Sequence, residues 1–280
     1  MEHIEIINNL EIRLKEPFDL GFIKQFGELF WVLDTQSSGN LCLGVKNANK
    51  KYFIKFAGAK TINDHDLPSD DAIDRLKAAV PKYKELEHNS MARIIESKEI
   101  GNGYALVFEW IEGEKIGNND YYISDNFYSI PINKRINVFE EILLFHAHVA
   151  KCGYVAIDFN CNNVIYNYDT CKVTICDIDF YSKQSYMNGM GSIFGVKTLM
   201  SPEEYRCAAL IDEVTNVYTM GATAFLLLSH GNRTLEDWIL NEKLYNVVKK
   251  AVSNTRRQRQ QSIMQLFKEW DNAKGEKYVQ

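Results

Sequence analysis

The segment Gly153–Tyr181 contains the side chains whose types and spacing are best suited to chemistry. Asp158 and Asn163 stand in the spacing D-x-x-x-x-N, and Asp177 and Asp179 follow after two short apolar runs. Two strands joined by a turn would place these groups at the outer ends of a hairpin, where they could hold a cation. Phosphoryl transfer uses such a set, because one Asp positions the attacking hydroxyl while an Asn and a second Asp hold the metal. The competing interpretation of any single Asp is a solvated hairpin end.

A lysine and a small-residue loop earlier in the chain could serve the same chemistry. Lys55 lies within the apolar predicted strand 52–56. Because an unpaired buried ammonium is costly, Lys55 either meets an anion or points to water from an edge strand, and the strand alone leaves both open. In the loop before it, Ser37, Ser38 and Gly39 are small enough to let backbone N–H groups approach phosphate oxygens.

Length, composition and charge bound the class of protein. The 280 residues allow one large domain or two lobes, and the 46% hydrophobic share is enough for a core. The net charge of −5 argues against nucleic acid or an anionic membrane as partner. No apolar run is long enough to span a membrane, and the charged N-terminus does not resemble a signal peptide. The six cysteines are scattered without a C-x-x-C pair, which predicts reduced thiols in a cytoplasmic protein.

The hydrophobic pattern predicts a first lobe built from an antiparallel sheet and one helix. Residues 1–27 look like an N-terminal extension of weak strand or helix character. The helix is expected over residues 69–88, with Pro81 kinking or interrupting it. Turn residues separate the expected strands, which cover residues 29–33, 41–45, 52–56, 91–95 and 104–110.

After Trp110 the pattern changes to a mainly helical second lobe. Residues 111–115 form a polar connector and candidate hinge. His146 and His148 stand two apart on a predicted helix, where their side chains do not face each other, so a metal pair is not expected. The predicted helices cover 133–151, a segment starting at Ser201, 214–229, 235–252 and 257–274. The expected domains are therefore 1–27, 28–110 and 111–280.

In this order, the motifs resemble the eukaryotic-type serine/threonine protein kinase family over roughly residues 29–270. The resemblance implies a bilobal α+β fold, ATP and Mg²⁺ as cofactors and a protein substrate. By similarity, loop 34–40 covers the phosphates, and Lys55 contacts the α- and β-phosphates. Phe108 resembles the gatekeeper, and the backbone of Glu109 and Ile111 would hold adenine.

The resemblance also assigns the groups of the second lobe. Asp158 would be the catalytic Asp and Asn163 a metal ligand. Asp177 lies at nearly the usual distance from Asn163 and is slightly preferred as the second ligand, whereas Asp179 gives the usual D-F pair with Phe180. Strand parity would let both aspartates face the cleft.

A further family motif lies at Ser201-Pro-Glu203, which resembles the A-P-E motif that closes the activation segment. Glu203 would then pair with Arg257 or Arg259 near the end of the chain.

The chain departs from the family at several positions. The phosphate loop keeps only its last glycine, Gly39, with Asp34 and Gln36 at the other two positions. The usual H-R-D reads A-I-D, which removes the Arg that senses a phosphorylated activation loop. Asn160 replaces a Lys that would steady the moving phosphate, so we expect a low rate.

Three more departures concern supporting groups. Val196 replaces a Thr near the catalytic Asp, and Asn216 replaces a structural Asp in the buried helix. The usual acidic partner of Lys55 falls near Ala79, which is not acidic, and neither Asp74 nor Glu85 can be assigned instead.

These features leave three functional hypotheses. The first is a protein serine/threonine kinase, favoured by the Ser-Pro-Glu segment and the long loop before it. The second is a small-molecule kinase of the aminoglycoside phosphotransferase type, favoured by the D-I-D-F run and the missing Arg. The third is a pseudokinase that binds partners without catalysis, favoured by the degenerate phosphate loop and by Asn160.

Overall fold

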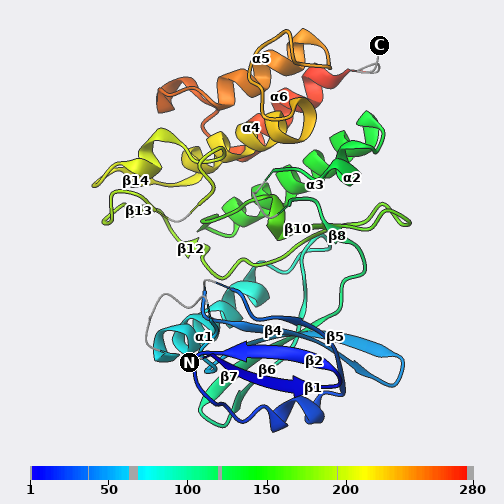
Figure 1. Cartoon of the computed structure of the whole chain (residues 1–280). Coiled ribbons are helices and arrows are strands. Elements are labelled where there is room, and N and C mark those ends of the chain that lie inside the picture. The colour runs from blue at the N-terminus through cyan, green and yellow to red at the C-terminus, as the bar shows by residue number, and fades with distance from the viewer. Residues whose placement is uncertain (1, 37, 63–68, 119–121, 194, 276–280) are drawn as a thin grey trace. The chain divides into compact units, whose positions relative to one another are not determined.

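A computed structural model describes residues 2–36, 38–62, 69–118, 122–193 and 195–275 (Figure 1). The chain divides into two compact units, Met1–Glu87 with Ala92–Glu112 and His88–Met91 with Gly113–Gln280. Antiparallel sheets and separate helices make the fold α+β, as the sequence predicts. The division after Glu112 lies close to the boundary expected after Trp110. Residues 1–27, expected as an extension, belong to the first unit.

The first unit is organised around a five-stranded antiparallel sheet with the strand order β3-β4-β5-β7-β6. Four strands lie where the pattern predicts them, but the strand expected at 91–95 begins at Ile94. Since β5 is a central strand, Lys55 does not lie on a sheet edge. The strands are β3 (Glu28–Leu33), β4 (Leu41–Asn47), β5 (Lys50–Ala57), β6 (Ile94–Ile100) and β7 (Gly103–Glu109).

Helix α1 (Ser69–Glu85) packs against β5, β6 and β7 and runs unbroken through Pro81, so the expected interruption is wrong. Leu76, Ala79 and Tyr83 are buried, and this packing offsets the backbone hydrogen bond that Pro81 cannot make. The Tyr83 ring lies 5.1 Å from that of Phe108. The helix therefore covers the face of the sheet that carries Phe108.

The N-terminal segment covers the other face of the same sheet. It forms the hairpin β1 (His3–Ile7) and β2 (Leu10–Leu14), drawn in dark blue in Figure 1, and the short helix η1 (Gly21–Gln25). Ile12 and Phe22 join Ile54 and Phe56 in one buried cluster. The rings of Phe22 and Phe56 lie 4.5 Å apart. Residues 1–27 thus complete the hydrophobic core of the first unit.

The second unit is built on helix α4 (Glu213–Ser229), which packs against α3 (Ile132–Lys151), α5 (Glu242–Ala251) and α6 (Ile263–Lys274). Nearly all of α4 is buried, in agreement with its apolar sequence. Helices α5 and α6 begin later than expected, because Asn241 and Ser262 cap them: their side chains accept hydrogen bonds from backbone N–H groups of the first turn.

Short strands and turns surround this helical core. The sheet order β11-β10-β8 joins β8 (Glu114–Lys115), β10 (Val164–Tyr166) and β11 (Val173–Ile175). Two further pairs are β9 (Tyr154–Val155) with β12 (Ser182–Lys183), and β13 (Tyr186–Met187) with β14 (Leu210–Ile211). Short helices are α2 (Asp125–Tyr128), η2 (Cys161–Asn163), η3 (Pro202–Tyr205) and η4 (Arg256–Gln258).

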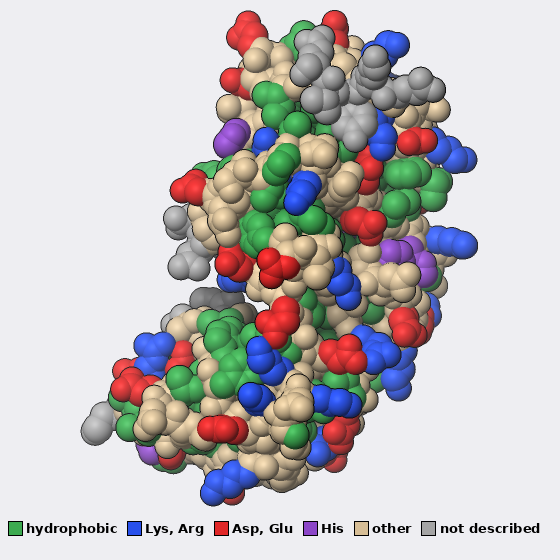
Figure 2. Space-filling view, turned by 90° about the vertical axis from the view of Figure 1, so that its right-hand side faces the viewer, with side chains coloured by type: hydrophobic (Ala, Val, Ile, Leu, Met, Phe, Trp, Pro, Cys, Tyr) green, Lys and Arg blue, Asp and Glu red, His purple; other side chains and the backbone are tan. Residues whose placement is uncertain are grey.

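The surface and the cysteines agree with the composition. On the face drawn in Figure 2, basic and acidic side chains are interspersed among the described residues. All six cysteines lie in the described part of the chain, and no disulfide joins them. No helix among the described residues combines the length and apolar character that crossing a membrane requires.

Candidate functional site

The β10–β11 hairpin brings Asn163 next to the segment that contains both candidate metal aspartates. Val164 pairs with Ile175, and beyond that pair the backbone N–H of Cys176 donates to the Asn163 carbonyl oxygen at 2.8 Å. Asn163 therefore stands opposite Cys176, and Asp177 is the next residue along the chain. The hairpin that the sequence predicts has formed, with its polar groups at the open end.

Backbone conformation distinguishes the candidate aspartates. Asp158 and Asp177 have φ values of 61° and 58°, a left-handed conformation that non-glycine residues rarely adopt. Such residues concentrate at functional sites, where the surrounding structure holds them. Asp177 is exposed, whereas Asp179 is buried and only 2% of its surface is exposed. Because strand β11 ends at Ile175, the side-chain alternation of a strand does not continue through Asp177 and Asp179, and the two need not face the same side. A ligand that arrives from solvent would contact the exposed Asp177.

A buried Tyr–His pair lies beside these carboxylates. His146 Nδ1 contacts the Ile142 carbonyl oxygen at 2.8 Å, and Nε2 contacts the Tyr181 hydroxyl at 2.9 Å. Burial lowers the pKa of His146 to about 4, so the ring is neutral at pH 7. Nδ1–H must then donate to Ile142, and Nε2 accepts from the Tyr181 hydroxyl. Both ring nitrogens of His146 are therefore used in buried hydrogen bonds.

Tyr181 also shows that the two carboxylates share one neighbourhood. Its pKa lies well above the ordinary value, first because it is buried and then because the charges of Asp177 and Asp158 disfavour a phenolate. Both carboxylates therefore lie within electrostatic range of the Tyr181 hydroxyl. Neither Tyr181 nor its bond to His146 was expected from the sequence, because a buried Tyr and a buried His each resemble ordinary core residues.

The backbone just before Asp158 is fixed by the buried helix α4. Asn216, 3% exposed, accepts from the Ala156 N–H through Oδ1 and donates from Nδ2 to the Ala156 carbonyl oxygen, both at 2.7 Å. An ionised Asp could accept but could not donate. Asn at position 216 therefore satisfies both backbone groups of Ala156, two residues before Asp158.

Asn160, which replaces the expected Lys, shapes the loop instead of extending toward a ligand. Its Nδ2 donates to the Asp158 carbonyl oxygen at 3.0 Å, and its Oδ1 accepts from the backbone N–H of Asn162 at 2.9 Å. The backbone N–H of Asn160 donates in turn to Asn163 Oδ1 at 2.8 Å. This reciprocal capping box begins η2 and orients Asn163.

Asn163 and Asp177 carry oxygen donors of the kind that Mg²⁺ prefers. No cluster of three His, Cys, Asp or Glu side chains suited to a metal occurs among the described residues. Mg²⁺ is commonly held by one or two carboxylates together with substrate phosphates and water. Asp177 supplies an exposed carboxylate, and Asn163 Oδ1 keeps one lone pair beyond its bond to Asn160. Asp179 is 2% exposed and Asn163 is 8% exposed.

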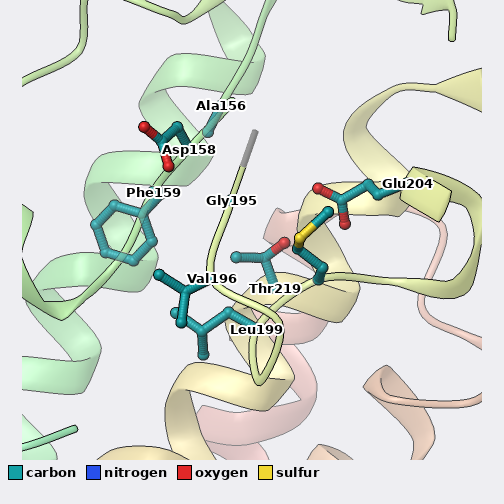
Figure 3. Close-up of a pocket in the computed structure, with 9 residues that line it drawn as sticks. Ala156, Asp158, Phe159, Gly195, Val196, Leu199, Glu204 and Thr219 are labelled. Atoms are coloured by element: carbon teal, nitrogen blue, oxygen red, sulfur yellow. The ribbon is translucent and has the colours of Figure 1, made fainter. Parts of the chain in front are cut away.

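A small hollow opens beside Asp158, lined by side chains from three segments (Figure 3). Val196 and Phe159 contribute apolar walls, while Thr219 and Glu204 contribute polar groups. Burial raises the pKa of Glu204 to about 7, and the neighbouring Glu203 charge acts in the same direction. The hollow thus has a mixed apolar and polar lining next to the candidate catalytic carboxylate, and the carboxyl group of Glu204 is partly neutral at pH 7.

The Ser-Pro-Glu segment is tied to the end of the chain as the resemblance implies. Glu203, 1% exposed, receives two hydrogen bonds from Arg259: Nη1 to Oε1 at 2.6 Å and Nη2 to Oε2 at 2.9 Å. Of the two expected partners, Arg259 is therefore the one that pairs. Arg256, which the sequence did not single out, also bonds Glu203, at 2.7 Å, and Asp212, at 2.6 Å. Burial alone would raise the pKa of Glu203, but Arg259 outweighs it and lowers that pKa to about 2.

In the first unit, Lys55 is 7% exposed and lies opposite Cys42 and Leu106 on the neighbouring strands. Burial on a central strand favours an anionic partner over a solvent-facing side chain. Glu109 ends β7 with an exposed side chain that pairs with Arg93 at 2.5 Å, and Ile111 is half-buried. The adenine contacts expected of Glu109 and Ile111 involve their backbone, which lies at the end of this strand.

Loop 34–40 is folded on itself. Gly39 has a φ of 75°, which explains the glycine, but its N–H donates to the Gln36 carbonyl oxygen at 3.2 Å. Ser38 Oγ accepts from Asn40 Nδ2 at 3.0 Å. Ser37, also expected to face phosphate, lies outside the described residues. Phosphate binding through the Gly39 N–H would require this turn to open.

Comparison with known proteins assigns no family, since no family model matches the chain and no curated protein matches it.

Proposed function

We propose that the chain is an ATP- and Mg²⁺-dependent phosphotransferase of the serine/threonine protein kinase type, which transfers the γ-phosphate to a protein hydroxyl. The observation that carries the proposal is the hairpin geometry: Asn163 stands beside Asp177, and both Asp177 and Asp158 adopt left-handed backbone conformations within range of Tyr181. The proposal assigns phosphate contacts to Lys55 and loop 34–40, and the metal and the acceptor hydroxyl to Asp158, Asn163 and Asp177.

Each polar group in and around the β10–β11 hairpin has a defined task under this proposal. Asp158 accepts a hydrogen bond from the acceptor hydroxyl and orients it toward the γ-phosphate. Asn163 and Asp177 hold Mg²⁺, which neutralises charge on the phosphates. Asn216 holds the backbone that carries Asp158 through its two hydrogen bonds to Ala156. Asn160 adds no positive charge near the moving phosphate, so turnover should be slow.

A protein acceptor is favoured by the segment around Glu203. The Glu203–Arg259 pair is buried and bidentate, which fixes the Ser-Pro-Glu turn next to the hollow that contains Asp158 and Glu204. Such a fixed segment beside the catalytic group can support an extended peptide. A small-molecule kinase of the aminoglycoside type, the alternative, generally lacks this segment.

A second candidate function, a nucleotide-binding module without catalysis, is favoured by two observations. The Gly39 N–H is already used in a turn, and Asn160 is folded onto the Asp158 backbone. This candidate predicts that ATP raises the thermal unfolding temperature while no phosphate is transferred.

The decisive experiment measures transfer of labelled γ-phosphate by the purified full chain with Mg²⁺, to itself, to lysate proteins and to a panel of small hydroxyl compounds. Asp158→Ala should reduce transfer by at least about 100-fold, because the group that orients the hydroxyl is lost. Asp169→Ala is the matched control, since Asp169 is exposed at the turn of the same hairpin.

Transfer that persists in Asp158→Ala would contradict the catalytic assignment. Label confined to small hydroxyl compounds would favour the small-molecule kinase. An ATP-induced thermal shift with no labelled product would favour the binding module.

A further inference from the structure

The N-terminal hairpin contributes a cation to the start of loop 34–40. The guanidinium of Arg13, on β2, donates two hydrogen bonds to the Asp34 carboxylate: Nε to Oδ2 at 3.1 Å and Nη2 to Oδ1 at 2.9 Å. The backbone N–H of Arg13 also donates to Oδ2, at 2.8 Å. Forked Arg–carboxylate contacts are strong and fix geometry as well as charge. One residue of β2 therefore holds Asp34 by three hydrogen bonds.

The two side chains differ in exposure, and this decides the charge of Asp34. The Asp34 side chain is 6% exposed, whereas that of Arg13 is 40% exposed. Burial alone would raise the pKa of Asp34, but the hydrogen bonds and charge of Arg13 outweigh burial and hold that pKa below its ordinary value. Asp34 therefore carries a full negative charge at pH 7, and Arg13 balances it.

The same loop is held at two further points from within the first unit. Arg75, on α1, donates from Nη1 to the Ser38 carbonyl oxygen at 3.0 Å. The Thr61 hydroxyl donates to the Gln36 carbonyl oxygen at 3.3 Å. Of these contacts, only that of Arg13 neutralises an acidic side chain of the loop.

An unbalanced carboxylate at this position would oppose a polyphosphate ligand. Like charges repel strongly where solvent is partly excluded, and Asp34 is nearly buried. We infer that Arg13 is a positioning residue for the nucleotide: it cancels the charge of Asp34 and fixes the start of loop 34–40, which makes the N-terminal hairpin part of the phosphate-binding apparatus. This inference rests on the proposed nucleotide-dependent function.

The inference predicts an effect that depends on the phosphates of the ligand. In the full chain, Arg13→Ala should raise the Kd for ATP about tenfold, the loss expected when a charged hydrogen-bonded pair is broken. The Kd for adenosine, which lacks phosphates, should stay within about twofold of the wild type. Arg13→Ala combined with Asp34→Asn should recover most of the ATP affinity, because no unbalanced charge remains.

Calorimetric titration with ATP and with adenosine provides both values, and Lys77→Ala is the control. Lys77 forms an exposed pair with Glu99 at 2.7 Å in the same unit and makes none of the loop contacts described above. If Arg13→Ala does not fold, Arg13→Lys keeps the charge but loses the fork, and should give a smaller loss of ATP affinity with the same insensitivity of adenosine.

Three results would overturn the inference. If Arg13→Ala lowered the affinity for ATP and for adenosine equally, Arg13 would have only a structural role. If the Kd for ATP did not change in Arg13→Ala, Arg13 would have no role in nucleotide binding. In both cases the wild type still binds ATP and the proposed function stands. If the wild-type chain bound neither ATP nor adenosine, this would contradict the proposed function, and the role inferred for Arg13 would be contradicted as well.

Discussion

The two units hold their candidate functional loops by different means. In the first unit, loop 34–40 is held by Arg13, whose side chain is 40% exposed, and by bonds to backbone carbonyls. In the second unit, Asn216, the His146–Tyr181 pair and the Glu203–Arg259 pair are all buried. Exposed contacts are weakened by water and salt, whereas breaking buried polar contacts leaves groups unsatisfied at a high free-energy cost.

Two carboxyl groups, Asp34 in the first unit and Glu204 in the second, have pKa values shifted in opposite directions. Asp34 has a lowered pKa, so its contribution to stability is present at neutral pH and is lost as the pH falls through that lowered value. Glu204 has a pKa raised to about 7, so the folded state keeps its proton longer than the unfolded state does. Its contribution is therefore lost as the pH rises toward and through 7. One carboxylate has a cationic partner, and the other is mainly desolvated.

The largest effect that tests this comparison should come from Arg259. Arg259→Met removes both guanidinium bonds to Glu203 and leaves a carboxylate that is 1% exposed with Arg256 and Thr215 as its remaining partners. The free energy of unfolding should fall by about 3 kcal/mol, as for other buried pairs broken on one side. Chemical denaturation measures this change. A loss below about 1 kcal/mol would mean that Arg256 alone suffices, and the contrast between the units would weaken.

An intermediate effect should come from Asn216. Asn216→Asp keeps the shape and the acceptor but removes the donor to the Ala156 carbonyl oxygen and buries a charge. We expect a loss of about 1–3 kcal/mol in the free energy of unfolding. We also expect a fall in kcat larger than any rise in KM for ATP, because the backbone before Asp158 is displaced.

Asn254→Asp is the control for that change, since it makes the same substitution at an exposed position. Equal behaviour of the two variants in stability and kcat would show that the bonds to Ala156 do not matter.

A third effect, smaller than that of Arg259→Met, should appear as a change in pH dependence. Between pH 5 and pH 8 the wild type should lose on the order of 2 kcal/mol through Glu204, because its pKa is about 7 in the folded state and near 4.5 when unfolded. Glu204→Gln carries no titrating proton, so this part of the loss should vanish. Unfolding at both pH values, for both proteins, measures the difference. An identical pH dependence would mean that Glu204 is ionised throughout, balanced by Arg259.

Much of the secondary structure could be predicted from the sequence, because it depends on residues that are close together along the chain. Alternating or helical spacing predicted four strands of the large sheet, as well as α1, α3 and α4, and turn residues predicted the β10–β11 hairpin. Predictions from local sequence were wrong where a tertiary contact outweighed the local preference. Pro81 was expected to kink or interrupt α1, but the helix is not interrupted, because Leu76 and Tyr83 are buried on the sheet.

The side chains that support the candidate site were harder to predict from the sequence. Tyr181, His146 and Arg13 carry no spacing signal, because their partners lie far away along the chain. The pairing of Glu203 with an Arg near the chain end was anticipated by resemblance, yet Arg256 was missed. A guanidinium at either position could reach Glu203, and only the folded backbone shows that both do.

Periodicity and turn chemistry predicted the main strands and helices from the sequence, because they act between near neighbours. Motif spacing singled out Asp158, Asn163, Asp177 and Asp179 as candidate groups. The tertiary structure alone separated exposed Asp177 from buried Asp179, because this depends on a left-handed backbone turn at Asp177 after β11 ends. It also placed residues 1–27 in the core of the first unit, through contacts that no local pattern encodes.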